Sequence, residues 1–145
     1  MNKYIENQVQ ESYKVTQEIY KDKKLMALIK SVALKMISIY KSGNKVLLAG
    51  NGGSASDAQH IAGELVSKFY FDRPGLSSFA LTTDTSVITA IGNDYGYEEI
   101  FSRQIQANGN KGDMFIGIST SGNSKNILQA IKECRKKGII SVGLT

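Results

Sequence analysis

One glycine-rich stretch, Gly50–Glu64, restricts the fold most, because it follows directly on a short apolar run. That run, Val46–Ala49, has the length and composition of a buried strand. Three glycines and an asparagine cannot extend a strand comfortably, so the chain is expected to turn there. A helix is expected from Ser54 to about Phe69, with Ser54 as its N-cap and Asp57 completing a capping box. The predicted order is strand, glycine-rich loop and helix.

The glycine-rich loop suits an anion or another polar ligand. Free backbone N–H groups and the positive end of the helix dipole point out of such a loop, and glycine lets a ligand approach the backbone closely. Open α/β sheets bind ligands at the carboxyl ends of their strands. The spacing fits neither the dinucleotide fingerprint nor the lysine-containing phosphate loop. A tight strand-to-helix connection without any ligand also explains the loop, and both interpretations stay open.

The helix after this loop carries His60 and Glu64, four residues apart and therefore on one helix face. Imidazole and carboxylate at that spacing can hold two corners of a zinc site. The alternative is an ordinary polar pair on a solvated face. His60 is the only histidine, so further ligands would be carboxylates, amides, the single cysteine or groups from another subunit.

A second strand-to-helix loop is rich in hydroxyl groups. The apolar run Met114–Ile118 leads into Ser-Thr-Ser-Gly-Asn-Ser at positions 119–124, and Ser124 is a candidate N-cap for a helix over Lys125–Lys137. Hydroxyls and free N–H groups at a helix start can cradle a phosphate without a lysine. A run of capping serines is the alternative. Four hydroxyl residues within six positions exceed what a cap needs, so we favour the phosphate cradle.

The remaining elements complete an alternating pattern of helices and strands. We expect helices at 2–20 and 25–42, a short strand at 77–81, a helix around 87–91 capped by the polar loop 82–85, a turn at 92–96, a helix at 97–107 and a strand at 139–145. This order predicts a parallel sheet with helices on both faces. We treat 1–145 as one domain, with N-terminal helices in 1–43 and an α/β core in 44–145. Because the chain stops at a strand, a C-terminal helix is expected to be missing.

Composition excludes several classes of protein. At 145 residues, 41% apolar, the chain has no apolar run of about 18 residues and no apolar signal-peptide core, so we expect no membrane association. The single Cys134 rules out an intramolecular disulfide and fits a reducing cytoplasm; we interpret it as structural or incidental. The net charge of +5 is scattered, which suits an anionic small substrate better than nucleic acid.

Five motifs are similar, in the same order, to those of a known enzyme family: residues 50–54, 57–60, 73–75, 92–94 and 117–124. On them the chain resembles the phosphoheptose isomerases, a branch of the sugar-isomerase (SIS) domain superfamily. The resemblance implies a flavodoxin-like three-layer α/β sandwich and a homotetramer with active sites at subunit interfaces. It also implies conversion of sedoheptulose 7-phosphate to D-glycero-D-manno-heptose 7-phosphate, the first step of heptose synthesis for lipopolysaccharide or another surface glycan.

The resemblance also implies roles for single residues. The phosphate would be held by Ser119, Thr120, Ser121 and Ser124, and the sugar would be lined by Asn51, Gly52, Gly53, Asn93 and Asp94. His60 and Glu64 would bind Zn²⁺, and Glu64 would also contact the substrate and transfer the proton. Aldose–ketose isomerisation needs a base near C1 and C2, a group that polarises their oxygens, and an anchored phosphate for orientation.

One departure from the family concerns the metal. The family's remaining zinc ligands, a glutamine and a histidine, come from a C-terminal helical segment that these 145 residues do not contain. Taken alone, the chain therefore holds half of a metal site. Either it is part of a longer protein, or the product is incomplete and inactive.

Two other function classes compete with the isomerase. A tetrameric SIS relative binds the bacterial replication initiator without catalysis, but its position matching Glu64 is not acidic. Glu64 and the pair Ser121-Gly122 therefore favour the enzyme. Phosphosugar-sensing SIS modules are the third class, and these are usually fused to a DNA-binding domain, which this sequence does not include.

Overall fold

A computed structural model describes all 145 residues, which form two compact units, Met1–Lys35 and Met36–Thr145. The first unit contains α1 (Asn2–Lys21) and most of α2 (Lys23–Lys41). Asp22 separates the helices: its carboxylate accepts hydrogen bonds from the N–H groups of Lys24 and Leu25, at 2.9 and 3.0 Å, and so caps α2. No side chain of α1 is buried. None of the helices has the length and apolarity that a membrane crossing requires.

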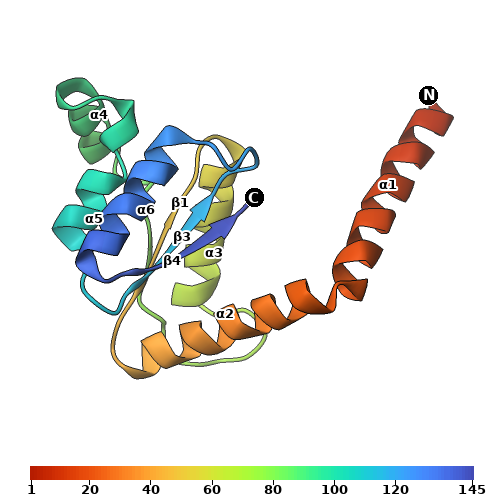
Figure 1. The fold of residues 1–145 in the computed structure, drawn as a ribbon, viewed down its shortest axis with the longest axis horizontal. Helices are drawn as coiled ribbons and strands as arrows, with labels where there is room; N and C mark the ends of the chain where they lie inside the picture. The colour runs from red at the N-terminus through yellow and green to blue at the C-terminus, as the bar shows by residue number, and fades with distance from the viewer. The chain divides into compact units, whose positions relative to one another are not determined.

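The second unit is a parallel α/β sheet flanked by helices (Figure 1). After the end of α2 its elements are β1 (Val46–Ala49), α3 (Gly53–Val66), β2 (Ser78–Ala80), α4 (Thr85–Asp94), the 3₁₀ helix η1 (Tyr97–Glu99), α5 (Ser102–Asn108), β3 (Met114–Ile118), α6 (Lys125–Lys137) and β4 (Ile140–Leu144). The strand order is β2-β1-β3-β4, and all neighbours are parallel. The predicted fold class and order of elements are confirmed.

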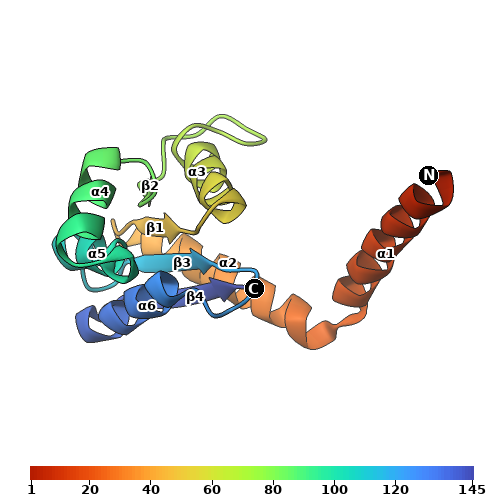
Figure 2. The ribbon, with the colours of Figure 1, turned by 90° about the horizontal axis from the view of Figure 1, so that it is seen from above.

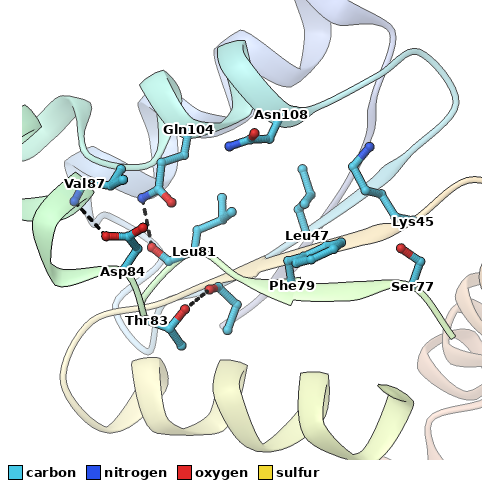
Figure 3. A pocket seen from close by; sticks show the side chains of 11 residues that line it. Lys45, Leu47, Ser77, Phe79, Leu81, Thr83, Asp84, Val87, Gln104 and Asn108 are labelled. Atoms are coloured by element: carbon cyan, nitrogen blue, oxygen red, sulfur yellow. Dashed lines mark hydrogen bonds between the residues drawn. The ribbon is translucent and has the colours of Figure 1, made fainter. Parts of the chain in front are cut away.

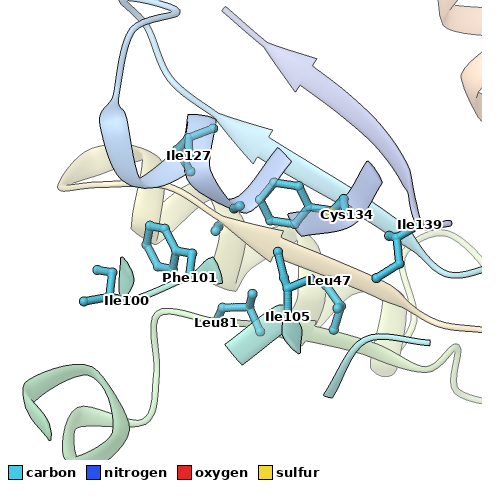
Figure 4. Close-up of a cluster of buried hydrophobic side chains, with 11 residues drawn as sticks. Leu47, Leu81, Ile100, Phe101, Ile105, Ile127, Cys134 and Ile139 are labelled. Atoms are coloured by element: carbon cyan, nitrogen blue, oxygen red, sulfur yellow. The ribbon is translucent and has the colours of Figure 1, made fainter. Parts of the chain in front are cut away.

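Helices cover both faces of the sheet (Figure 2). Alternate strand residues fill two cores, one on each face. On one face, Leu47 packs near Ile105 of α5 and Ile127 and Cys134 of α6 (Figure 4), and Phe115 belongs to the same core. On the other face, Leu48 and Met114 pack against α3 and the C-terminal end of α2, which contributes Ile39. Strands buried on both faces read as continuous apolar runs, which is why Val46–Ala49 and Met114–Ile118 were recognisable from the sequence.

Cys134 belongs to the core on the α6 side and is fully buried. Burial raises the pKa of its thiol to about 11. The group therefore stays protonated and unreactive at neutral pH, which agrees with its interpretation as a structural residue.

The predicted start of α3 is wrong. The helix begins at Gly53 with Gly52 as its N-cap, and Ser54 lies inside the first turn, where its N–H donates to the Asn51 carbonyl at 3.1 Å. Gly52 has a φ of +57°, a conformation that glycine adopts without strain, so the chain turns earlier than a serine cap would require. No side chain caps α3, so the capping box with Asp57 does not form, and the helix ends at Val66 rather than Phe69.

Two boundaries between β2 and β3 also differ from prediction. Helix α4 continues through Gly92 to Asp94, and the turn comes only at Tyr95 and Gly96, where φ is +94°. The predicted helix 97–107 is divided into η1 and α5. The Ser102 hydroxyl donates to the Glu99 carbonyl at 3.0 Å, and this local bond competes with the backbone hydrogen bonds that a continuous helix would need. The predicted cap of α4 is confirmed, because the Asp84 carboxylate accepts the Val87 N–H at 2.9 Å.

The amino ends of β1 and β3 are joined by Asp113, which is 1% exposed. Its carboxylate accepts the backbone N–H groups of Lys45 and Asn110, at 3.1 and 2.8 Å, and pairs with the Lys45 ammonium at 2.8 Å. These bonds satisfy a buried charge completely and hold the two central strands in register at this edge.

We therefore expect Asp113→Ala to lower the free energy of unfolding by about 3 kcal/mol, since one ammonium and two backbone N–H groups lose their acceptor. Urea denaturation measures the change. Lys136→Ala is the control: it removes an ion pair with Glu133 in which the lysine is 72% exposed, and stability should stay nearly unchanged. Equal effects of both variants would contradict this role of Asp113.

Candidate functional site

Two ligand-type loops leave the sheet side by side at its carboxyl edge. Strands β1 and β3 are neighbours, and their register pairs Ala49 with Gly117. The glycine loop, residues 50–53, and the serine loop, residues 119–124, therefore begin at the same level of two adjacent strands (Figure 1). In parallel sheets this edge is where ligands bind.

The glycine loop is shaped by close approach as well as by backbone conformation. A Cβ atom on Gly50 would collide with the backbone of Ser54, so helix α3 starts directly against the end of β1. The carbonyls of Asn51 and Gly52 accept N–H groups of the first turn of α3, at 3.1 and 3.0 Å for Ser54 and Ala55. The loop is therefore a tight and internally bonded connection, with the N–H groups of Gly52 and Gly53 left for a ligand.

The serine loop presents hydroxyls and free N–H groups together. The Ser119 and Ser124 hydroxyls lie 2.9 Å apart, and the Gly122 N–H donates to the Ser119 carbonyl at 2.9 Å, which closes the turn. Ser124 is the N-cap of the 13-residue helix α6, but its side chain makes no cap bond. The N–H groups of Lys125 and Asn126 are thus left without a side-chain cap, whereas the Ile127 N–H is bonded to the Asn126 oxygen. The positive end of the helix dipole adds to the attraction of the free N–H groups for an anion.

Two side chains connect these loops across the edge. Asn51 and Asn126 exchange two amide hydrogen bonds, at 3.0 and 2.8 Å, and the Tyr97 hydroxyl donates to the Asn51 oxygen at 3.4 Å. The residues surround a pocket of about 430 Å³, lined by Asn51, Tyr97, Glu98, Ser124, Lys125 and Asn126.

Sequence reasoning missed Tyr97 and Asn126. One signal existed for Asn126: together with Ala130 and Cys134 it lies on the helix stripe that faces the core, and a polar residue on such a stripe needs a buried partner. For Tyr97 no comparable signal exists, because its contact with Asn51 spans 46 residues.

The pocket also contains one ion pair. The Lys125 ammonium lies 2.8 Å from the Glu98 carboxylate, and this hydrogen bond raises the pKa of Lys125. Lys125 therefore remains a cation next to Ser124. A pocket with hydroxyls, free N–H groups and a neighbouring cation can bind a phosphate group.

His60 and Glu64 lie on the same face of α3, with the His60 Nε2 and Glu64 Oε1 atoms 3.9 Å apart. Their side chains are 76% and 36% exposed, and no hydrogen bond or ion pair connects them to either loop. The chain has no cluster of three or more potential metal-binding side chains. The pair fits two corners of a zinc site by donor type and spacing, and the remaining corners need ligands from outside this cluster.

The other predicted site residues are more dispersed. Asn93 and Asp94 lie at the C-terminal end of α4, where the Asn93 amide donates to the Asp94 carboxylate at 2.9 Å. Both are exposed, and so are Thr120 and Ser121. The structure therefore brings together the two loops, while the metal pair and the end of α4 remain separate, solvent-accessible groups.

A second cavity, of about 490 Å³, lies between β2, α4 and α5 (Figure 3). Apolar side chains, Leu47, Phe79, Leu81 and Val87, form much of its lining. Both of its charged side chains and its buried amide already have partners: Asp84 caps α4, Lys45 pairs with Asp113, and the Gln104 amide donates to the Leu81 carbonyl. Because its charged groups are engaged in the fold, we place the candidate site at the two loops.

Comparisons with known proteins place the chain in a family. Residues 9–145 match the SIS domain family. The phosphoheptose isomerase of Aneurinibacillus thermoaerophilus is 68% identical over the whole chain, which covers 73% of that protein. Phosphoheptose isomerase 2 of Campylobacter jejuni subsp. jejuni is 65% identical, again over the whole chain, which covers 72% of that protein.

Solved structures show the same fold. A phosphoheptose isomerase from Francisella tularensis superimposes with a TM-score of 0.94 at 38% identity, with 99% of this chain and 74% of that chain covered. The enzyme from Neisseria gonorrhoeae gives 0.90 at 39% identity, with 98% and 73% covered.

The crowding at Gly50 makes a prediction about the loop. Gly50→Ala should lower the free energy of unfolding by about 1–3 kcal/mol, because the added methyl group must displace the first turn of α3. Gly63→Ala is the matched control. Gly63 lies within α3 with open space around it, so this substitution should raise the free energy of unfolding by up to about 1 kcal/mol. Thermal or urea unfolding of both variants checks the opposite signs, and the same sign in both would refute the close approach.

Proposed function

Because the chain belongs to the SIS domain family, and within it to the phosphoheptose isomerases, we propose that it is an aldose–ketose isomerase acting on a phosphosugar. Its reaction converts D-sedoheptulose 7-phosphate to D-glycero-D-manno-heptose 7-phosphate. The relatives at 65–68% identity carry the isomerase name, so the non-catalytic partner-binding alternative is not favoured.

One structural observation supports this most directly: the serine loop and the glycine loop meet over one pocket and are joined by Asn51 and Asn126. In the proposal, Ser119, Thr120, Ser121 and Ser124 hold the phosphate with the first N–H groups of α6. The glycine loop, with Asn93 and Asp94, lines the sugar. A phosphate anchored at one end of a seven-carbon chain orients the distant carbons C1 and C2 for reaction.

Glu64 is the proposed base. It takes one proton from C1 of the ketose, and the electron pair forms the C1–C2 double bond of an enediol as the C2 oxygen gains a proton. Return of a proton to C2, with loss of the proton on the C1 oxygen, gives the aldose. A carboxylate that is 36% exposed is accessible to a bound substrate and suits both proton transfers.

His60 and Glu64 are the proposed zinc ligands in this chain, with the rest of the coordination coming from elsewhere. A divalent ion held by these two residues would supply Lewis-acid chemistry toward the substrate oxygens at C1 and C2. Since no third such side chain lies near the pair, the proposal requires ligands from a separate segment or subunit to complete the site.

The cellular setting is also a proposal. We place the enzyme in the cytoplasm, as a homotetramer, at the first step of heptose synthesis for lipopolysaccharide or another surface glycan. Apolar side chains along α1, including Ile5, Val9 and Ile19, are exposed, which is expected of a helix that another subunit covers.

The first test is turnover of sedoheptulose 7-phosphate by the full-length protein, measured as purified, after chelation, and after zinc is added back. We expect aldose heptose phosphate to form, chelation to abolish its formation and zinc to restore it. His60→Ala should not be restored by zinc at the concentration that restores the unmodified protein. A folded oligomer without turnover in any of these conditions would refute the isomerase proposal and favour the partner-binding relative.

Glu64→Gln separates proton transfer from binding. We expect kcat to fall by about 10²- to 10⁴-fold, because the amide cannot accept the C1 proton, while the Kd for the substrate changes only a few-fold. Zinc content measured on the same sample shows whether metal was lost with the base. Glu133→Gln, a carboxylate on α6 that pairs with Lys136, is the control and should keep full activity. Unchanged kcat in Glu64→Gln would exclude this residue as the base.

A further inference from the structure

Asn126 is a buried polar side chain at the point where the two loops meet. It is 4% exposed and lies in the first turn of α6, directly after Ser124 and Lys125. Its neighbours on the same helix stripe, Ala130 and Cys134, are core residues. An amide in such a place must have its polar atoms bonded, and its bonds therefore carry structural information.

The bonds fix how the Asn126 amide is oriented. Its Oδ1 atom accepts the Ile127 N–H at 3.0 Å, and because a backbone N–H can only donate, the atom that it meets must be the oxygen. The amide nitrogen then faces the glycine loop. It donates to the Asn51 oxygen at 2.8 Å, while the Asn51 nitrogen donates to Asn126 Oδ1 at 3.0 Å.

The orientation of Asn51 follows from that of Asn126. Because Asn126 donates through its nitrogen and accepts through its oxygen, the Asn51 oxygen must face the Asn126 nitrogen, and the Asn51 nitrogen must face the Asn126 oxygen. One N–H of the Asn51 amide remains for a ligand. The Tyr97 hydroxyl occupies the other side of the Asn51 oxygen at 3.4 Å. A backbone group of α6 thus determines which hydrogen-bonding group the glycine loop presents.

We propose that Asn126 is a positioning residue, which holds Asn51 with one amide N–H toward the sugar and couples the glycine loop to the serine loop. It acts through Asn51 and does not itself touch the substrate. The inference deepens the proposed function and rests on it, because Asn51 is there a sugar contact and the serine loop a phosphate site. It predicts that sugar recognition and phosphate recognition depend on Asn126 to different degrees.

Asn126→Asp tests the donor role with little change in shape. The new side chain can still accept from Ile127 and from the Asn51 nitrogen. When ionised, however, its second oxygen faces the Asn51 oxygen, and two acceptors repel each other. When protonated, the same oxygen donates and restores the original pattern. Burial raises the pKa of a carboxyl group, so this change falls within an accessible pH range.

The experiment measures the Kd of the full-length protein for sedoheptulose 7-phosphate and for inorganic phosphate, by calorimetry at pH 8 and at the lowest pH where all variants stay folded. Asn110→Asp is the matched control, because it makes the same change on an exposed residue at the amino edge of the sheet. Glu98 and Lys125 line the same pocket in every variant, so each Kd is divided by that of the control at the same pH.

At pH 8 we expect Asn126→Asp to raise the Kd for sedoheptulose 7-phosphate by a factor about ten times larger than the factor for inorganic phosphate. At low pH this difference should shrink to less than about threefold. If the new carboxylate acted only by repelling anions, the Kd values of both ligands would rise by the same factor. That result in a folded variant, or a loss that does not change with pH, would overturn the proposal.

A second measurement needs no variant. In the unmodified protein, side-chain amide NMR should show slow hydrogen exchange for the bonded N–H groups of Asn51 and Asn126, compared with exposed Asn110, and addition of the sugar phosphate should shift the free Asn51 N–H. Exchange at Asn51 as fast as at Asn110 would overturn the positioning role. If the protein binds the sugar phosphate but never isomerises it, the proposed function fails, while the Kd ratios and the exchange rates still decide the role of Asn126.

Discussion

The parallel pairing of β1 with β3 is the constraint on which the rest of the structure depends. Its register puts Ala49 opposite Gly117, so both strands deliver their loops to the same level of the carboxyl edge. A Cβ on Gly117 would lie 2.7 Å from the Ile127 side chain, so glycine at this position lets α6 pack directly over the end of β3. The N-terminus of α6 consequently lies within hydrogen-bonding distance of the glycine loop.

The two edges of the sheet carry different kinds of polar group. At the amino edge, the Asp113 carboxylate is buried and fully bonded to Lys45 and Asn110, so its polar atoms stabilise the fold and are closed to ligands. At the carboxyl edge, hydroxyls and N–H groups of the serine loop stay partly free. A rigid core whose loops at one end carry unpaired hydrogen-bonding groups lets an α/β protein bind a ligand without unfolding its scaffold.

Local patterns were sufficient for most of the fold and for part of the site. The bounds of β1, β3 and α6 agree with prediction to the residue, because short apolar runs and an amphipathic helix ended by Gly138 are strong local signals. The start of α3 was missed, since it depends on the positive φ of Gly52 and not on the preference of Ser54 for a cap. The two loops were predicted as ligand-binding, whereas Asn126 and Tyr97 were not, because their contacts join residues 75 and 46 positions apart.

The sequence by itself determined the order of elements, the parallel sheet, and the residue types that a phosphosugar isomerase uses, because each of these follows from periodicity, turn chemistry or a contiguous motif. The tertiary structure decided which of those residues meet. It joined the glycine loop to the first turn of α6 through one partly buried amide pair, and it left His60 and Glu64 as a solvent-accessible pair on α3. The reason is physical: hydrogen-bond partners are selected by strand register and helix packing, and these bring together residues that no local pattern connects.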